Sequence, residues 1–104
     1  MTYELDHIFI LSDVDAPAAD KLVEAGIKEG RSNVHTGQGT TNRRFYFDNA
    51  MIEFLWVHDV DEAGSAFTNP TYLLPRWQGR MNGASPFGIC FRPTDANGFP
   101  PPFP

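Results

Sequence analysis

The chain has 104 residues, the length of one small domain with a single hydrophobic core. Hydrophobic residues make up 41% of it and aromatic residues 13%, which is the composition of a folded protein rather than a disordered one. The net charge of -5 comes without a basic stripe, which argues against a nucleic-acid partner. No apolar stretch approaches membrane-spanning length and the acidic N-terminus is unlike a secretory signal, so the sequence predicts a cytoplasmic protein without membrane contact.

Residues 3–11 are predicted to form a strand, because apolar residues recur along them in strand-like alternation. Side chains of a strand point to opposite faces in turn. One face of this strand is therefore expected to carry Tyr3, Leu5, His7, Phe9 and Leu11.

A helix is expected directly after this strand. Residues 12–15 carry side chains that cap helix starts, and Pro17 is tolerated in a first helical turn. Gly26 is the kind of residue at which helices end. The apolar residues at helical spacing are Val14, Ala18, Leu22 and Ala25.

Two further strands are predicted to form a hairpin. Residues 43–47 and 51–57 are strand-like, and the segment 48–50 between them is a tight-turn signal. Residues 36–42, rich in glycine and small polar side chains, are expected to form a turn or loop. The first half of the chain is thus predicted to run strand, helix, then two or three antiparallel strands.

The second half of the chain is less regular. Residues 58–66 are compatible with a short helix, and residues 87–91 form an apolar run of strand length. Within that run, Cys90 is the chain's single cysteine, and it is either a small core residue or a reactive thiol. We expect one domain over residues 1–93, followed at 94–104 by a proline-rich tail of extended polyproline conformation.

Two strand residues have side chains that can bind a metal ion. His7 lies within one apolar strand and Glu53 within another. Burying such groups is costly unless something hydrogen-bonds or coordinates them. The sequence therefore predicts that the imidazole and the carboxylate meet in one hollow, as metal ligands or as a polar core pair.

Three segments in order carry a resemblance to a known family. They are residues 5–10 (Leu-Asp-His-Ile-Phe-Ile), residues 37–47, and residues 52–57 (Ile-Glu-Phe-Leu-Trp-Val). Together they resemble the first βαβββ module of the vicinal oxygen chelate superfamily, and within it most closely the glyoxalase-like domain group. Glyoxalase I, extradiol dioxygenases and bleomycin-resistance proteins belong to this superfamily.

The resemblance implies a fold class. It predicts an α+β protein with a cupped, antiparallel-rich mixed sheet, in which residues 1–58 make a complete first module. Residues 59–93 would form a partial second module, opening with a strand near residues 83–89.

The resemblance also implies a metal site. In the family each module gives one ligand from its first strand and one from its last, positions held here by His7 and Glu53. An imidazole and a carboxylate suit zinc, nickel, iron, cobalt or manganese, so the ligands alone do not select the metal ion. Such a metal would act as a Lewis acid on a substrate with two neighbouring oxygens.

The chain departs from the family pattern in its second half. At the position matched to His7 it has Phe87, which cannot bind a metal, and it ends before a second full set of strands. One chain would offer two of the usual four ligands, so the site is either vestigial or completed across a homodimer interface. An uncovered sheet edge is a further reason to expect a homodimer.

The resemblance and the residues together give a set of candidate ligand-binding side chains. The polar loop is either a plain connection or a wall of the ligand groove, with amide and hydroxyl groups facing the ligand. Trp56 is read either as a core anchor or as a surface on which a ligand stacks. The candidates are Gln38, Thr40, Asn42, Arg43 and Trp56.

Three functions follow from these observations. The first is a small-molecule-binding, glyoxalase-like domain whose metal site is vestigial or completed by a dimer. The second is a metal-dependent lyase or isomerase of glyoxalase type, or a dioxygenase-like enzyme, with Glu53 as the catalytic base. The third is an interaction protein in which His7 and Glu53 form only a polar pair.

Overall fold

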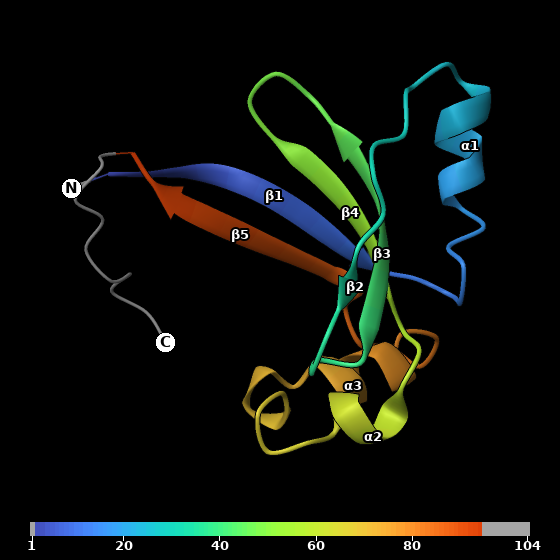
Figure 1. The fold of residues 1–104 in the computed structure, drawn as a ribbon, viewed down its shortest axis with the longest axis vertical. Helices are drawn as coiled ribbons and strands as arrows, with labels where there is room; N and C mark the ends of the chain where they lie inside the picture. The colour runs from blue at the N-terminus through green and yellow to red at the C-terminus, as the bar shows by residue number, and fades with distance from the viewer. Residues whose placement is uncertain (1, 95–104) are drawn as a thin grey trace.

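A five-stranded mixed sheet forms the centre of the protein, seen in a computed structural model that describes residues 2–94 (Figure 1). The strand order is β2-β3-β4-β1-β5, with short helices on one face and at one end of the sheet. This architecture confirms the predicted α+β class. The strands and helices are β1 (Tyr3–Leu11), α1 (Ala19–Glu24), β2 (Val34–His35), β3 (Thr40–Tyr46), β4 (Met51–Val57), α2 (Val60–Ala63), the 3-10 helix η1 (Asn69–Thr71), α3 (Leu73–Gln78) and β5 (Phe87–Pro93).

Strand β1 lies between β4 and β5 in the sheet and joins the two halves of the chain. It pairs in parallel with β4, where His7 lies beside Met51, and antiparallel with β5 on its other side. Strands β3 and β4 form the predicted hairpin, closed by a hydrogen bond from the Phe47 amide to the Ala50 carbonyl oxygen. β3 begins at Thr40, so the loop before it is shorter than predicted.

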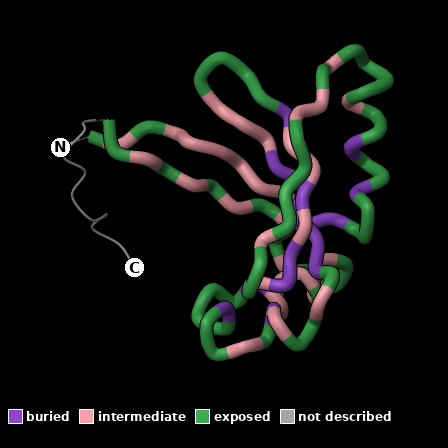
Figure 2. The backbone as a smooth tube through the Cα atoms, in the orientation of Figure 1, coloured by how far each residue is buried: buried purple, intermediate pink, exposed green. Residues whose placement is uncertain are grey.

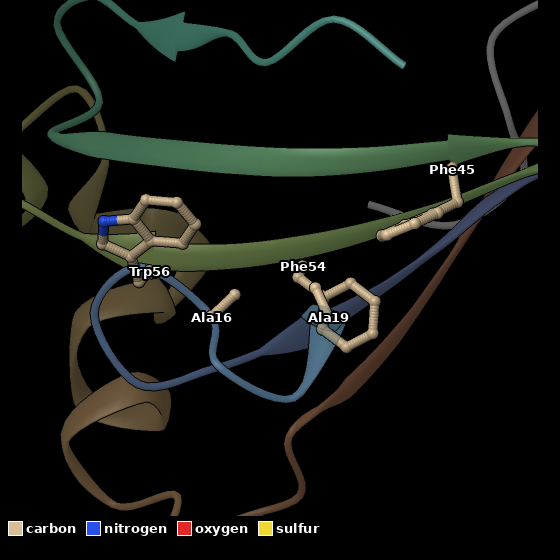
Figure 3. Close-up of a cluster of buried hydrophobic side chains, with 5 residues drawn as sticks. All are labelled: Ala16, Ala19, Phe45, Phe54 and Trp56. Carbon is tan, nitrogen blue, oxygen red and sulfur yellow. The ribbon is translucent and has the colours of Figure 1, made fainter. Parts of the chain in front are cut away.

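The main hydrophobic core lies between the sheet and the segment that holds α1 (Figure 3). Phe45 and Phe54 meet edge to face there, with ring centroids 5.9 Å apart. Buried residues gather along β3, β4 and the chain around α1, whereas much of β1 and β5 is half-buried or exposed (Figure 2). The buried members of this core are Ala16, Ala19, Phe45, Phe54 and Trp56.

Helix α1 starts later than the sequence predicts. The expected capping residues form a turn instead, in which Asp15 and Ala16 adopt positive φ angles of 67° and 46°. A left-handed residue cannot continue a right-handed helix, so the helix begins only at Ala19, with no side chain capping it. As a result Val14 is exposed rather than buried, while Ala16 fills the core.

A β-bulge in β1 corrects a second prediction. The register with β5 shifts between Leu5 and His7, so Asp6 is an extra residue in the ladder. The bulge breaks the alternation of side chains, and Leu5 pairs with Phe91 on the face opposite to His7. The expected shared face is therefore limited to His7, Phe9 and Leu11.

The end of the sheet that follows β4 is covered by the second-half helices. The short helix α2 confirms the helix expected in this region, and its first turn is capped by Asp59, whose Oδ1 accepts a hydrogen bond from the Glu62 amide at 3.0 Å. From α3, Leu73 packs on Leu11 and Leu55 in a second, smaller core. Within residues 2–94, no helix is long and apolar enough to cross a membrane.

Strand β5 forms one edge of the sheet, as expected for a strand that opens a second module. In the pairing of β5 with β1, Phe87 lies opposite Ile10 and Cys90 lies opposite His7. Side chains of paired residues share a face, so Phe87 points away from the His7 face. Of the predicted tail, residues 95–104 lie outside the described part of the chain.

Candidate functional site

Glu53 is a buried carboxylate on the sheet face that turns away from the main core. Its neighbours in β4, Ile52 and Phe54, both pack into the core beside α1. Because side chains alternate along a strand, Glu53 projects from the other face, where it is only 6% exposed. We call this the site face.

Three polar side chains converge on the carboxylate of Glu53. Its Oε2 accepts hydrogen bonds from the Asn42 side-chain amide and from His35 Nε2, the latter at 3.1 Å. Its Oε1 faces His7 Nε2 at 3.7 Å, which is too long for a hydrogen bond. The site face thus brings the predicted pair together. Within residues 2–94, Oε2 of Glu53 is held by two hydrogen bonds, whereas Oε1 accepts none from a side chain. We call these four residues the Glu53 cluster.

The ring of His7 is hydrogen-bonded to its neighbour in sequence, Asp6, through the nitrogen that points away from Glu53. Its Nδ1 lies 2.7 Å from Asp6 Oδ2, and Arg92 Nη1 donates to Asp6 Oδ1 at 3.1 Å. The hydrogen bond from His7, followed by that from Arg92, holds the pKa of Asp6 below its usual value despite partial burial. An ionised Asp6 can only accept in this contact, so His7 donates a hydrogen bond from Nδ1 to Asp6 Oδ2.

The environment of Glu53 keeps it ionised in spite of burial. Burial raises the pKa of Glu53, but hydrogen bonds from His35 and Asn42 lower it, and the charges of both histidines lower it further. The net result is a pKa below the usual value for glutamate. The cluster therefore contains a buried negative charge that attracts cations and hydrogen-bond donors.

Cys90 lies on the site face opposite His7. Burial raises the pKa of its thiol, and the negative charges of Glu53 and Asp6 add to that effect. A raised pKa keeps sulfur in the thiol form, which is a poor nucleophile and metal ligand. Of the two readings of Cys90, these observations favour an unreactive packed residue.

The atoms of the cluster fit part of a metal site. His7 Nε2 and Glu53 Oε1 are the right donor types for a divalent ion, and each group is oriented by a second partner. Between residues 2 and 94, however, no three histidine, cysteine, aspartate or glutamate side chains are grouped to hold a metal ion together. The described chain can therefore supply two ligands of a metal ion, and not a closed site.

The candidate ligand-binding residues fall into two groups. Asn42 belongs to the Glu53 cluster, and Thr40, buried on the same face and in register with His35, accepts a hydrogen bond from Gln38 Nε2 at 2.8 Å. Trp56 lies in the main core (Figure 3), and Arg43, which pairs with the core residue Phe54, projects from the same face of the sheet. The structure thus brings Asn42 to the predicted site and places two other candidates on the opposite face.

Arg43 is engaged with acidic side chains near α1. Its Nη2 and Nε bind the two carboxylate oxygens of Glu29 at 2.7 and 2.9 Å, and its Nη1 binds Asp20 at 2.9 Å. Nη1 also donates to the carbonyl oxygen of Ala16 at 3.1 Å. With these partners Arg43 ties β3 to the turn before α1.

A hollow of about 300 Å³ is lined by neighbours of the Glu53 cluster, although no member of the cluster itself lines it. Arg44 lines it and is the cross-strand neighbour of Glu53 in the β3–β4 pair. Asp6 and Met51, next to His7 and Glu53 along the strands, also line it. The complete lining is Asp6, Arg44, Tyr46, Phe47, Asp48, Asn49, Ala50, Met51 and Arg92.

Sequence reasoning missed three residues of this region: Asp6, His35 and Arg44. Strand alternation would place Asp6 away from His7, and only the bulge brings it to the same face. His35 sits on the two-residue strand β2, too short to give a periodic signal. Arg44 is two residues from Asn42 in β3, so strand alternation puts both side chains on the site face. Of the three missed residues, Arg44 is therefore the one that the sequence pattern indicates.

Comparisons with known proteins bear on this fold. No curated protein matches the chain. The family model described as a glyoxalase-like domain matches residues 5–99, which includes most of β1, all of the other four strands and the residues of the Glu53 cluster. The chain therefore belongs to the glyoxalase-like domain family of the vicinal oxygen chelate superfamily.

Proposed function

We propose that the protein binds a small molecule on the site face, and that His7 and Glu53 form half of a metal site that a second copy of the chain completes. The observation that carries this proposal is the facing pair of His7 Nε2 and Glu53 Oε1, 3.7 Å apart. In each group, the atom that points away from this pair is already hydrogen-bonded. His7 Nδ1 bonds to Asp6, and Glu53 Oε2 accepts from Asn42 and His35.

The facing pair is the kind of arrangement that a cation stabilises. In the neutral form of His7 with the proton on Nδ1, bonded to Asp6, the lone pair of Nε2 faces an ionised carboxylate oxygen. Two acceptors that face each other repel unless a cation or a donor lies between them. Zinc, nickel, iron, cobalt and manganese all accept this donor pair, and the bound ion would supply Lewis-acid chemistry.

The hollow beside the cluster suits the proposed small molecule. Its volume of about 300 Å³ lies at the lower end of the range for ligand sites. Arg44 lines the hollow, and its Nε donates to the Arg31 carbonyl oxygen. Its guanidinium is cationic, so oxygen atoms of a ligand in the hollow would find a hydrogen-bond donor there. The ligand would lie between this hollow and the facing pair.

A homodimer would supply what one chain lacks. The described residues hold no complete set of metal ligands, and β5 is an edge strand of the sheet that they form. A second copy that docks along this edge would bring its own His7 and Glu53 to the assembly. A cytoplasmic location is part of the same proposal and awaits localisation of the tagged protein in cells.

A metal-binding experiment tests the proposal. Protein purified without chelator is analysed for metal content and titrated calorimetrically with zinc, nickel and cobalt. We expect near-stoichiometric metal, with affinity reduced more than about 100-fold in His7→Ala and Glu53→Gln, because loss of a ligand exceeds the 10- to 100-fold cost of losing an outer partner. The matched control is His58→Ala, an exposed histidine bonded to Thr41 outside the cluster.

The opposite result is equally clear. If neither purified nor metal-titrated protein binds a divalent ion, and His7→Ala has unchanged stability, the metal half of the proposal is wrong. Binding of small organic ligands without metal would then leave a binding domain with a vestigial site.

A metal-dependent lyase or isomerase is the second candidate. It is favoured by Glu53 Oε1, which accepts no hydrogen bond from a side chain of residues 2–94 and would accept a proton from a bound substrate. The metal-loaded protein is incubated with an α-hydroxy ketone in D₂O, and deuterium at the carbon next to the carbonyl is followed by NMR. Exchange that Glu53→Gln abolishes supports an enzyme, and absence of exchange with a set of such compounds supports the binding function.

A further inference from the structure

We propose that Asp6 is a positioning residue that sets the ring of His7 through a β-bulge, and that Arg92 of β5 holds Asp6 in place. This inference rests on the proposed function, since it explains how His7 is prepared to bind a ligand. It assigns a role to the Asp6–Arg92 pair, which lies behind the Glu53 cluster and does not face Glu53.

The bulge is what allows two sequence neighbours to act together. In a regular strand Asp6 and His7 would point to opposite faces. The register shift at this position lets both project toward the site face, where Asp6 Oδ2 lies 2.7 Å from His7 Nδ1. Bulges commonly re-aim side chains in this way next to functional sites.

Arg92 fixes the other oxygen of Asp6. Its Nη1 donates to Asp6 Oδ1 at 3.1 Å, its Nε donates to Glu4 Oε1 at 2.9 Å, and its Nη2 donates to the Asn49 carbonyl oxygen at 3.1 Å. One guanidinium therefore links β5, β1 and the turn before β4. Each Asp6 oxygen has its own donor, so the carboxylate has little freedom to rotate.

Orientation of His7 determines which ring nitrogen is available. A histidine that donates from Nδ1 to a carboxylate keeps its proton there and leaves Nε2 as the acceptor. Here Nε2 is the atom that faces Glu53 Oε1. Asp6 bonds to Nδ1 of His7 and leaves Nε2 for a ligand. In the same way, His35 and Asn42 bond to Oε2 of Glu53 and leave Oε1 for a ligand.

The test compares Asp6→Ala and Asp6→Asn with Glu4→Gln as the matched control. Glu4→Gln alters the other carboxylate partner of Arg92 but leaves Asp6 and His7 intact. Long-range ¹H–¹⁵N NMR at about pH 8.5, where histidine in general is neutral, reads the tautomer of His7 without metal. Zinc affinity of the same variants is the second readout.

We expect the Nδ1–H tautomer in the unmodified protein and in Glu4→Gln. Asp6→Ala should lose this preference and bind zinc about 10- to 100-fold more weakly, as for other outer partners of metal-binding histidines. Asp6→Asn offers one oxygen to two donors, Arg92 Nη1 and His7 Nδ1, so it should keep the tautomer and the affinity only in part.

Two results would overturn the inference. One is an Nε2–H tautomer in the unmodified protein, which requires no variant to fold. The other is an Nδ1–H tautomer that persists in folded Asp6→Ala. If instead the tautomer follows Asp6 as expected but no variant binds zinc, the positioning role of Asp6 stands and the metal half of the proposed function fails.

Discussion

Adjacent residues of β3 serve opposite faces of the sheet. Arg44 points to the site face beside Glu53, while Arg43 points to the core side and binds Glu29 and Asp20. The sequence suggested Arg43 as a ligand-binding residue, but its guanidinium is already engaged by two carboxylates. At the scale of single residues, Arg43 is a structural tie between the sheet and the turn before α1.

Replacement of Arg43 should therefore change stability in a pH-dependent way. The hydrogen bond from Arg43 lowers the pKa of Glu29 below its usual 4.5, so this interaction stabilises the fold above pH 4.5 and is lost as pH falls through the lowered pKa. We expect Arg43→Gln to reduce the free energy of unfolding by about 2 kcal/mol at pH 7. Urea unfolding followed by tryptophan fluorescence from pH 7 to pH 3 measures this.

The control for that series is Arg31→Gln, which changes an exposed arginine. The difference in the free energy of unfolding between the unmodified protein and Arg43→Gln should become smaller below pH 4.5. The free energy of unfolding of Arg31→Gln should stay close to that of the unmodified protein from pH 7 to pH 3. A difference for Arg43→Gln that is constant across the whole range would show that Glu29 is not its main partner.

At the scale of elements, β5 packs closely on β1 because Gly88 has no side chain. Gly88 lies opposite Phe9, and a Cβ atom at position 88 would collide with the Phe9 ring. The ring lies over the backbone of the edge strand, with the Arg76 guanidinium 5.6 Å from its centroid. Arg76 also donates to the Phe87 carbonyl oxygen at 2.7 Å, so β5 is held from the end near α3.

Gly88→Ala should loosen the contact between β5 and β1. We expect a loss of about 1–3 kcal/mol in the free energy of unfolding, because an added methyl group forces the ring or the strand to move. A double-mutant cycle with Phe9→Leu is the control: the smaller side chain should recover part of the loss. Equal effects of Gly88→Ala in both backgrounds, measured by chemical denaturation, would contradict a steric cause.

At the scale of the whole molecule, burial is uneven. The core beside α1 and the helical end of the sheet are filled, while the outer edge of the sheet is exposed (Figure 2). Phe87, Ile89 and Phe91 follow each other on one face of β5 and are 59%, 61% and 52% exposed. Such a row on an edge strand is a surface suited to self-association.

A charge placed in this row should therefore weaken the proposed homodimer. Ile89→Lys is expected to shift the protein from dimer to monomer in sedimentation-velocity experiments at micromolar concentration, because the ammonium group would be buried without a partner. Val14→Lys is the control, since Val14 is 55% exposed but lies in the turn before α1. An unmodified protein that sediments as a monomer at every concentration would contradict the dimer.

The sequence predicted what alternation and turn chemistry determine, and missed what depends on irregular backbone. The hairpin followed from strand periodicity and turn chemistry, and the meeting of His7 with Glu53 followed from the cost of burying both groups and from the family resemblance. The late start of α1 did not, because two left-handed residues, Asp15 and Ala16, interrupt the apolar spacing. The bulge at Asp6 was equally hidden, since an extra residue in a ladder leaves no mark in a local pattern.

The parallel pairing of β1 with β4 has a consequence for the order of folding. The β3–β4 hairpin joins near neighbours and can close within microseconds, whereas β1 must find β4 across the long segment that holds α1. The hairpin alone contains Glu53 and Asn42 but not His7. The candidate site therefore forms only after the slower, non-local pairing of β1 with β4. Recovery of the site during refolding would then report that this pairing is complete.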